Sequence, residues 1–222
     1  WGLDTAPAPL TDFTIAIDTV ENMVAKMKEK PWPIYKIKVG VEGDMEMVAA
    51  LRKHTNAVLR VDANAGWTLE QALQKIPVLK ELGVEFVEQP LAKDDWEGMK
   101  VLYEKSELPL IADESCVAEA DVEKCHNHFH GINIKLTKCS GITPARRMIA
   151  RAKELGMKVM VGCMNESSVG TAAIAQLAPM LDYVDMDGPL LLAEDIGEGV
   201  NFEKGMILFN DLPGLGINVP SF

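Results

Sequence analysis

The feature that most constrains this chain is a regular alternation of short β-rich runs with amphipathic stretches. Eight apolar runs, each about as long as a buried strand and bounded by Gly, Pro or polar residues, predict eight strands. They are Phe13–Asp18, Ile34–Gly40, Val58–Asn64, Val84–Pro90, Leu108–Glu114, Gly131–Thr137, Lys158–Cys163 and Tyr183–Pro189. Because strands that alternate with helices form parallel sheets, this order predicts an α/β fold.

Seven amphipathic stretches between these runs predict helices. They cover residues 19–30, 44–55, 68–81, 94–105, 118–126, 143–155 and 167–178. Thr68 and Gln71 have the spacing of a capping box, and Gly83 and Gly156 stand where helices end. Eight units of about 28 residues favour a closed TIM-type (β/α)₈ barrel, in the modified form (β/α)₇β because no eighth helix is evident.

The same pattern predicts how the chain is divided. We expect a lead-in segment over residues 1–12, the (β/α)₇β barrel over 13–190 and a C-terminal return segment over 191–222. No linker interrupts the barrel, and an apolar patch at Met206–Phe209 is the most regular part of the return segment.

Composition excludes several classes of protein. The 33 acidic and 22 basic residues give a formal net charge of −11, which argues against a nucleic-acid partner because phosphate binding needs a basic face. No apolar run approaches the roughly 18 residues that a membrane span needs, and no secretory signal is evident. The four cysteines lack CxxC spacing and predict free thiols in a reducing compartment, the cytoplasm.

Ionisable residues stand at the ends of most predicted strands, although buried parallel strands are usually apolar. They are Lys38, Asp62, Glu88, Asp113, Lys135 and Asp187. The first five follow one another at 22 to 26 residues, so each has the equivalent place in its βα unit. A solvated strand end explains one such charge. Six at one period favour a shared site at the carboxyl ends of the strands, where barrel enzymes carry their active sites.

Strand alternation brings further polar residues to the same face, because residues i and i+2 point the same way. The resulting pairs are Lys36 with Lys38, Asp62 with Asn64, Asn133 with Lys135, and Asp185 with Asp187. By the same rule we expect Glu114 to point away from the face that Asp113 occupies.

The residue types at these strand ends predict a chemistry. Asp62, Glu88 and Asp113 are hard oxygen donors with no Cys or His among them, which suits Mg²⁺ or Mn²⁺. Three clustered carboxylates would be costly without a cation, so a metal is implied. Lys36 and the cation would lower the pKa of the Lys38 ammonium by repulsion. Lys135 would lie across the barrel, so that two lysines could exchange an α-proton from opposite faces of an enediolate.

These strands resemble the enolase superfamily, and within it the muconate-lactonising subgroup. The resemblance runs in order through essentially the whole chain and includes Lys36-Ile37-Lys38, Asp62-Ala63-Asn64, Val87-Glu88-Gln89-Pro90, Ala112-Asp113-Glu114-Ser115 and Asn133-Ile134-Lys135. It implies Lys38 and Lys135 as the two acid/bases. It also implies that Lys36 assists Lys38 and contacts the substrate carboxylate. Its implied ligands for one Mg²⁺ are Asp62, Glu88 and Asp113.

Asp185-Met186-Asp187 is similar to the Asp-x-Asp of dipeptide epimerases, in which the pair holds the free α-ammonium of the substrate. Two carboxylates on one strand face attract a cation and repel an anionic N-succinyl group. Alternatively, the pair caps its strand or meets a lysine. The resemblance implies inversion of the C-terminal Cα of a dipeptide, such as L-Ala-D/L-Glu, by two-base 1,1-proton transfer through an enediolate.

Two further segments, Thr11-Asp12-Phe13-Thr14 and Val161-Gly162-Cys163-Met164, resemble those of dipeptide epimerases and suggest two more substrate contacts. Thr14 and Cys163 would touch the substrate, although barrel packing explains both equally. Asn64 would face the substrate or support a neighbouring ligand. The family also has an N-terminal capping domain whose loops close over the barrel mouth, and this chain contains nothing that matches it. Ser140-Gly141 stands where the family usually has Gly-Gly.

Other functions remain open at this point. An N-acylamino acid racemase, a muconate cycloisomerase or an o-succinylbenzoate synthase would share the lysines and the metal ligands. A barrel without turnover, acting as a binding or scaffold protein, is a further alternative, and a homo-oligomer is left open. His126, His128 and His130 have spacing that could bind zinc. We expect a turn there, because the cluster precedes a strand at the amino end of the barrel.

Overall fold

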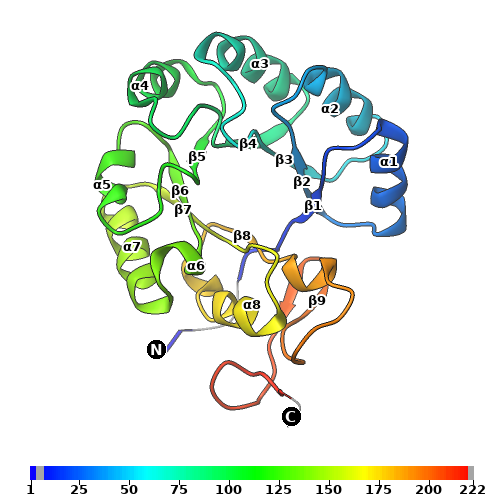
Figure 1. Cartoon of the computed structure of the whole chain (residues 1–222), viewed down its shortest axis with the longest axis vertical. Helices are drawn as coiled ribbons and strands as arrows, with labels where there is room; N and C mark the ends of the chain where they lie inside the picture. Colours follow the sequence, from blue (N-terminus) through cyan, green and yellow to red (C-terminus); the bar gives the residue numbers. More distant parts are fainter. Residues whose placement is uncertain (4–7, 220–222) are drawn as a thin grey trace.

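The computed structural model describes residues 1–3 and 8–219, and within these residues eight parallel strands form one barrel-shaped sheet (Figure 1). The strands follow the chain in order. They are β1 (Phe13–Ile15), β2 (Ile34–Lys38), β3 (Val58–Asp62), β4 (Val84–Glu88), β5 (Leu110–Ala112), β6 (Gly131–Ile134), β7 (Lys158–Gly162) and β8 (Tyr183–Asp185). The predicted TIM-type barrel is confirmed, with every strand inside its predicted run.

Helices form a ring outside the sheet (Figure 1). They are α1 (Val20–Glu29), α2 (Asp44–Arg52), α3 (Leu69–Glu81), α4 (Trp96–Lys105), α5 (Asp121–Cys125), α6 (Leu136–Cys139), α7 (Ile142–Glu154) and α8 (Ser168–Ala175). The predicted capping box at Thr68 and Gln71 begins α3. The short helix α6 was not predicted, and 3₁₀ helices cover Ala178–Met180 (η1) and Gly188–Leu191 (η2).

The barrel closes between β8 and the segment that precedes β1. Thr11 forms a parallel bridge with Val184, and the Asp12 amide donates to the Val184 carbonyl at 3.3 Å. The Met186 amide donates to Thr11 Oγ1 at 2.7 Å. Arg60, which is buried on β3, reaches across this seam and donates to Asp12 Oδ2 at 2.9 Å.

The apolar core has two parts. The larger one lies between the outer face of the sheet and the helices, which contribute fully buried residues such as Leu79, Leu102 and Ile149. A smaller cluster fills the barrel interior towards the amino ends of the strands, with Phe86, Ile111 and Met160 packed beside Tyr183. The buried Arg60 guanidinium packs against Phe86 and Tyr183 of this cluster. The charged residues at the carboxyl ends of the strands stand beyond it.

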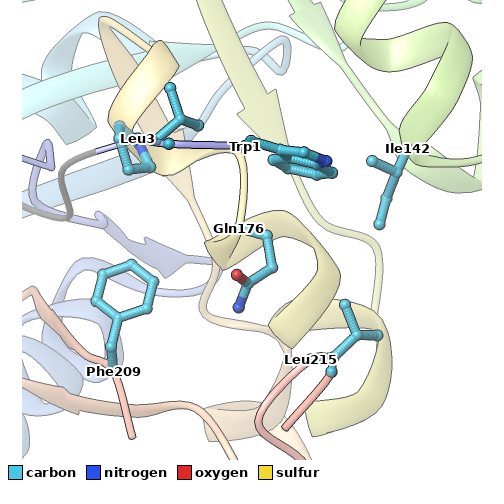
Figure 2. Close-up of a pocket in the computed structure, with 9 residues that line it drawn as sticks. Trp1, Leu3, Ile142, Gln176, Phe209 and Leu215 are labelled. Atoms are coloured by element: carbon cyan, nitrogen blue, oxygen red, sulfur yellow. The ribbon is translucent and has the colours of Figure 1, made fainter. Parts of the chain in front are cut away.

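The C-terminal segment forms an antiparallel hairpin of β9 (Asn201–Glu203) and β10 (Met206–Leu208). The Thr11 amide donates to the Gly205 carbonyl at 2.8 Å, so the hairpin is attached beside the barrel seam. A cavity of about 300 Å³ lies between the first residues and this segment, and Figure 2 shows its lining by Trp1, Phe209 and Leu215. Within the described residues, every helix is too short or too polar to cross a membrane.

Ser140 has a backbone conformation that favours glycine. It follows α6 with φ of 71° and ψ of 29°, and its side chain is exposed. The left-handed region costs a residue with a Cβ about 1–2 kcal/mol, against about 0.5–1 kcal/mol of extra chain entropy for Gly. We therefore expect Ser140→Gly to raise the free energy of unfolding by roughly 0.5–1 kcal/mol, measured by urea denaturation.

Ser140→Ala is the matched control, because it removes the hydroxyl and keeps the Cβ. Its free energy of unfolding should stay within about 0.5 kcal/mol of the wild-type value. Equal stabilisation by Ala and Gly would show that backbone strain at Ser140 is not the cause.

Candidate active site

A cavity of about 510 Å³ opens at the carboxyl ends of the strands. Nine of the eleven predicted site residues line it. They are Thr14, Lys36, Lys38, Asn64, Asp113, Lys135, Cys163, Asp185 and Asp187. The other two, Asp62 and Glu88, are buried and pair with each other in the register of β3 and β4. Strand alternation therefore brings the predicted residues together.

The two predicted acid/base lysines each meet a predicted metal ligand. Lys38 Nζ lies 2.6 Å from Asp62 Oδ2 and 3.0 Å from Asn64 Oδ1. Lys135 Nζ lies 2.8 Å from Asp113 Oδ2. Since Lys38 ends β2 and Lys135 follows β6, the two ammonium groups approach the cavity from well-separated strands.

Lys138 is a cavity residue that the sequence analysis missed. It lies on α6, one helical turn after Lys135, and its Nζ is 2.7 Å from Asp113 Oδ1. Asp113 therefore accepts from two ammonium groups, and they lower the pKa of its carboxyl against the effect of burial. The available signal was its spacing of three residues from Lys135. That spacing directs the Lys138 side chain into the cavity only because α6 is helical.

The orientation predicted for Glu114 is wrong. Glu114 lines the cavity, and its Oε1 accepts from Asn64 Nδ2 at 3.3 Å. The prediction extended strand alternation to this residue, whereas β5 ends at Ala112. Beyond the strand end, neighbouring side chains no longer point to opposite faces.

Glu88 has the properties of a cation ligand. It is fully buried, its Oε1 accepts from Asn133 Nδ2 at 2.6 Å, and its Oε2 has no hydrogen-bond partner among the described residues. Burial and the charges of Asp62 and Asp113 raise the pKa of Glu88 to about 8. A divalent cation between these carboxylates would remove that repulsion, so the donor set fits Mg²⁺.

The predicted metal ligands are nevertheless each held by other protein groups. Asp62 is paired with Lys38, Glu88 with Asn133, and Asp113 with two lysines. In the part of the chain that the structure describes, one group of three or more His, Cys, Asp or Glu residues has ligand atoms that all lie within 4.8 Å of one another. It consists of Cys163, Asp185 and Asp187. The predicted triad thus shares one region without being gathered at that distance.

Carboxylates dominate the electrostatic surroundings of Lys36 and Lys135. Burial lowers the pKa of the Lys36 ammonium, but Asp185, Glu88, Asp12 and Asp62 together raise it well above its usual value. Burial and Lys36 also lower the pKa of Lys135, and Asp113 and Glu88 outweigh both. A lysine base in this site therefore needs its carboxylate neighbours to be neutralised by another cation.

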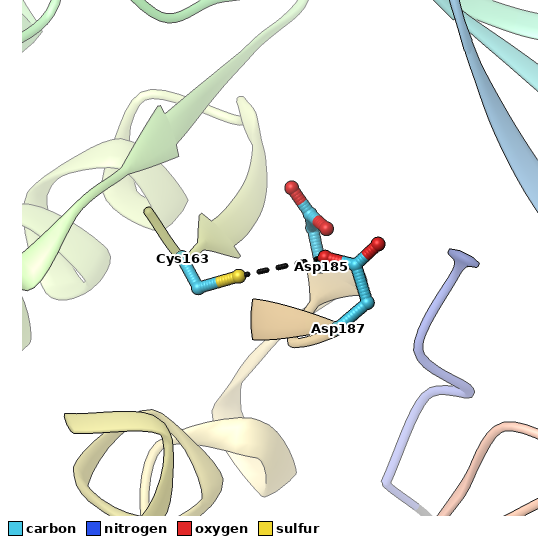
Figure 3. Close-up of side chains that lie close together, drawn as sticks. All are labelled: Cys163, Asp185 and Asp187. Atoms are coloured by element: carbon cyan, nitrogen blue, oxygen red, sulfur yellow. Dashed lines mark hydrogen bonds between the residues drawn. The ribbon is translucent and has the colours of Figure 1, made fainter. Parts of the chain in front are cut away.

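Asp185 and Asp187 lie side by side at the end of β8, next to Cys163 (Figure 3). Asp185 accepts a hydrogen bond from Lys36. The alternative that the aspartate pair meets a lysine therefore holds for Asp185. Asp187 Oδ2 accepts from the Thr14 amide at 2.6 Å. Burial and then Asp185 raise the pKa of Asp187, which indicates excess negative charge here.

Cys163 is a neutral neighbour of this pair. Its Sγ lies 3.7 Å from Asp187 Oδ1 and accepts from the Gly188 amide at 3.3 Å. Burial, Asp185 and Asp187 raise the pKa of the thiol, so it remains protonated and donates to Asp187. This side of the cavity thus suits a hydrogen-bonding cation such as an ammonium better than a metal that requires a thiolate.

The cysteine- and histidine-rich segment has structural contacts. Cys125 is buried at the end of α5, and His130 Nδ1 accepts from the Leu110 amide at 3.1 Å. His128 Nδ1 lies 3.2 Å from the His126 carbonyl. A turn at residues 127–128 lies between His126 and Phe129, which form an isolated bridge, so the predicted turn is confirmed.

Comparisons with known proteins support this interpretation. Residues 18–221 match the family of enolase C-terminal domain-like proteins. The chain is 57% identical over 219 residues to an L-Ala-D/L-amino acid epimerase of Flavobacterium johnsoniae. The matched region covers 99% of this chain and 65% of that protein. It thus spans about 65% of the length of that curated relative.

Solved structures give the same result. The substrate-liganded complex of L-Ala-D/L-Glu epimerase from Bacillus subtilis has a TM-score of 0.91 at 32% identity, over 97% of this chain and 64% of that one. A dipeptide epimerase from Cytophaga hutchinsonii, complexed with Mg and the dipeptide D-Ala-L-Val, has a TM-score of 0.91 at 30% identity, over 99% and 63%.

The raised pKa of Glu88 predicts a pH dependence of stability. The folded protein retains a proton on Glu88 that the unfolded chain releases near its usual pKa of 4.5. Stability from this group is therefore present at low pH and is lost as the pH rises towards about 8. We expect the free energy of unfolding in EDTA to fall more steeply over this range for the wild type than for Glu88→Gln.

Urea denaturation at several pH values measures this difference. Mg²⁺ should flatten the wild-type profile, because a bound cation replaces the proton at Glu88, and should change the Gln variant less. Parallel profiles for the two proteins in EDTA would contradict the assignment of the proton to Glu88.

Proposed function

This chain belongs to the family of enolase C-terminal domain-like proteins, and we propose that it forms the catalytic barrel of a Mg²⁺-dependent dipeptide epimerase. The observation that carries this proposal is that Asp185 and Asp187 face the same cavity as Lys38 and Lys135. An isomerase that exchanges an α-proton needs the lysines, and a substrate with a free α-ammonium needs the carboxylate pair. The names of the epimerases that this chain resembles support the same activity.

Different groups of the cavity would hold the two ends of the substrate. Asp185 and Asp187 would accept from the ammonium of the N-terminal residue, and the Cys163 thiol and Thr14 amide keep Asp187 in place. Lys36, close to Asp185 and Glu88, would contact the substrate carboxylate when it is released from its present partner. Asn64, which lines the cavity beside Lys38, would touch the substrate near the reacting carbon.

Inversion would depend on the two lysines. One of Lys38 and Lys135 would remove the proton from Cα of the C-terminal residue, and the other would return a proton from the opposite face. Asp62, Glu88 and Asp113 would hold Mg²⁺, which would stabilise the negative charge that develops on the substrate carboxylate. A bound cation would also compete with the lysines for Asp62 and Asp113, and would thereby release the ammonium groups that now contact these acids.

Several narrower assignments belong to the same proposal. The lead-in segment 1–12, the barrel 13–190 and the return segment 191–222 are its structural divisions, and a capping domain of the kind found in the family would complete the cavity. A reducing cytoplasmic location is supported by the four cysteines, all of which are free and buried. A homo-oligomer remains compatible with this site.

The test incubates the intact protein with Mg²⁺ and a set of L-Xaa-L-Yaa dipeptides in D₂O. NMR then follows the exchange of the Cα protons of the dipeptides. We expect loss of the Cα–H signal of the C-terminal residue alone. Asp187→Asn should raise the KM for the dipeptide about 10- to 100-fold, because a charge-assisted hydrogen bond is worth roughly 1.5–3 kcal/mol.

Asp94→Asn, at an exposed carboxylate outside the cavity, is the matched control and should leave the KM unchanged. The affinity for Mg²⁺ should also be nearly unchanged in Asp187→Asn. Exchange of N-succinyl amino acids without exchange of free dipeptides would instead indicate an N-acylamino acid racemase.

The two lysines should act on different stereoisomers. We expect Lys38→Ala to reduce exchange about 10²- to 10⁴-fold from the isomer whose proton Lys38 removes, because that loss is typical of a missing general base. Exchange from the opposite isomer should be affected less in a single-turnover experiment. Equal residual rates from both isomers would contradict the two-base assignment.

A further inference from the structure

Behind the paired aspartates lies a buried acid that the proposed mechanism does not use. Asp12 is 0% exposed and stands next to Asp185, which is 2% exposed, because its amide is bonded to the Val184 carbonyl. Each of these residues has a buried Oδ1 with no hydrogen-bond partner in the described part of the chain. A proton on one of the two carboxyls would supply the donor that both Oδ1 atoms lack.

The neighbours of the two acids indicate which one holds that proton. The charged groups that face them are Lys36, which donates to Asp185, and Arg60, which donates to Asp12 Oδ2 and is shared with Glu85. Burial and then Asp185 raise the pKa of Asp12 well above its usual value. Burial also opposes ionisation of Asp185, but Lys36 and the neighbouring Asp12 lower its pKa. Asp12 is therefore the acid, and Asp185 is the carboxylate.

Arg60 fixes the position of Asp12. Its Nη1 is 2.9 Å from Asp12 Oδ2 and its Nε is 2.7 Å from Glu85 Oε2. The guanidinium lies 5.2 Å from the Phe86 ring centroid and 5.0 Å from that of Tyr183. Because the guanidinium has contacts on both sides, it holds Asp12 Oδ2 in place, and Asp12 Oδ1 is left without a donor among the described residues.

One short segment thus supports both aspartates of the cavity. The Thr14 amide donates to Asp187 at 2.6 Å, and two residues earlier the Asp12 amide donates to the carbonyl of Val184, the residue that precedes Asp185. Thr11 accepts from the amide of Met186, which separates the two aspartates. The residues before and within β1 therefore set the position of the entire Asp-x-Asp.

We propose that Asp12 is a positioning residue for the ammonium-binding pair, in which it acts as a neutral acid that donates to Asp185 Oδ1. This bond orients Asp185 and lets it remain ionised within a closely packed group of carboxyls. The inference rests on the proposed function, because the ligand assigned to Asp185 and Asp187 is the α-ammonium of a dipeptide.

The test compares a dipeptide with its des-amino analogue, in which the ammonium is replaced by hydrogen, as ligands of the intact Mg²⁺-loaded protein. The ratio of their two dissociation constants measures the contribution of the ammonium. We expect Asp12→Leu, which cannot donate, to lower this ratio at least 10-fold. Asp12→Asn keeps a donor for Asp185 and an acceptor for Arg60, and should retain the ratio within about 3-fold.

Glu85→Gln is the matched control, because it changes the other partner of Arg60 and leaves Asp185 untouched. It should not alter the ratio, and no variant should change Mg²⁺ affinity. If Asp12→Leu weakens both ligands equally, Asp12 has a general structural role and the proposal is wrong. If the wild type binds neither ligand, the proposed function fails.

An infrared measurement keeps the inference testable in that case and also if Asp12→Leu does not fold. At neutral pH the wild-type spectrum should contain a protonated carboxylic C=O band that Asp12→Asn lacks. Identical carboxylic acid bands in the two proteins would show that Asp12 is ionised, and would overturn the proposal without reference to any dipeptide.

Discussion

The barrel buries charged side chains away from water, and the rest of the site depends on how those charges are balanced. An unpaired ion costs several kcal/mol in such an environment, whereas a paired and hydrogen-bonded ion is tolerated. Lys36 is accordingly paired with Asp185, Arg60 with Asp12, and Lys38 with Asp62. Glu88 faces other carboxylates and has no ammonium partner within hydrogen-bond distance among the described residues, so it retains a proton. Moving any of these groups would leave another one uncompensated.

This balance connects the metal ligands with the lysines. The acids that fit Mg²⁺ are the same acids that hold Lys38 and Lys135, so cation binding and the freedom of the lysines cannot be separated. The cluster around Phe86 and Met160 fills the barrel interior below the cavity, where Arg60 packs against it. The polar end of the barrel is therefore a network in which lysines and predicted metal ligands share partners.

Much of this could be predicted from the sequence, because the barrel has a period that the sequence repeats. Lys38, Asp62, Glu88 and Lys135 mark equivalent strand ends, and the alternation of strand residues then gives the direction of their side chains. The prediction failed at Glu114, because β5 ends at Ala112 and strand alternation no longer applies beyond it. The distances between the predicted metal ligands could not be predicted either, since they depend on which carboxylates are paired with lysines.

Contacts between distant residues were also beyond the sequence pattern. Arg60 and Asp12 are 48 residues apart, and Asp12 and Asp185 lie at opposite ends of the barrel sequence. No local period relates such residues, and Arg60 resembles an ordinary charge within a strand. Helix α6 is too short for hydrophobic periodicity to predict, so the direction of Lys138 could not be inferred. The role of Arg60 and Asp12 follows only from the contact between the segment before β1 and β8.

The seam between β8 and the segment before β1 has a consequence for local opening of the barrel. A bridge at Thr11 and Val184 and a few hydrogen bonds join the two sides, so separating them disrupts little regular structure. The same separation would remove Thr14 from Asp187 and Asp12 from Asp185, and with them the cation-binding geometry. A ligand bound to both aspartates therefore stabilises the closed barrel against this opening. Hydrogen exchange at the amides of Asp12, Thr14 and Met186 would slow in proportion to ligand occupancy, so a measurement of closure also reports binding.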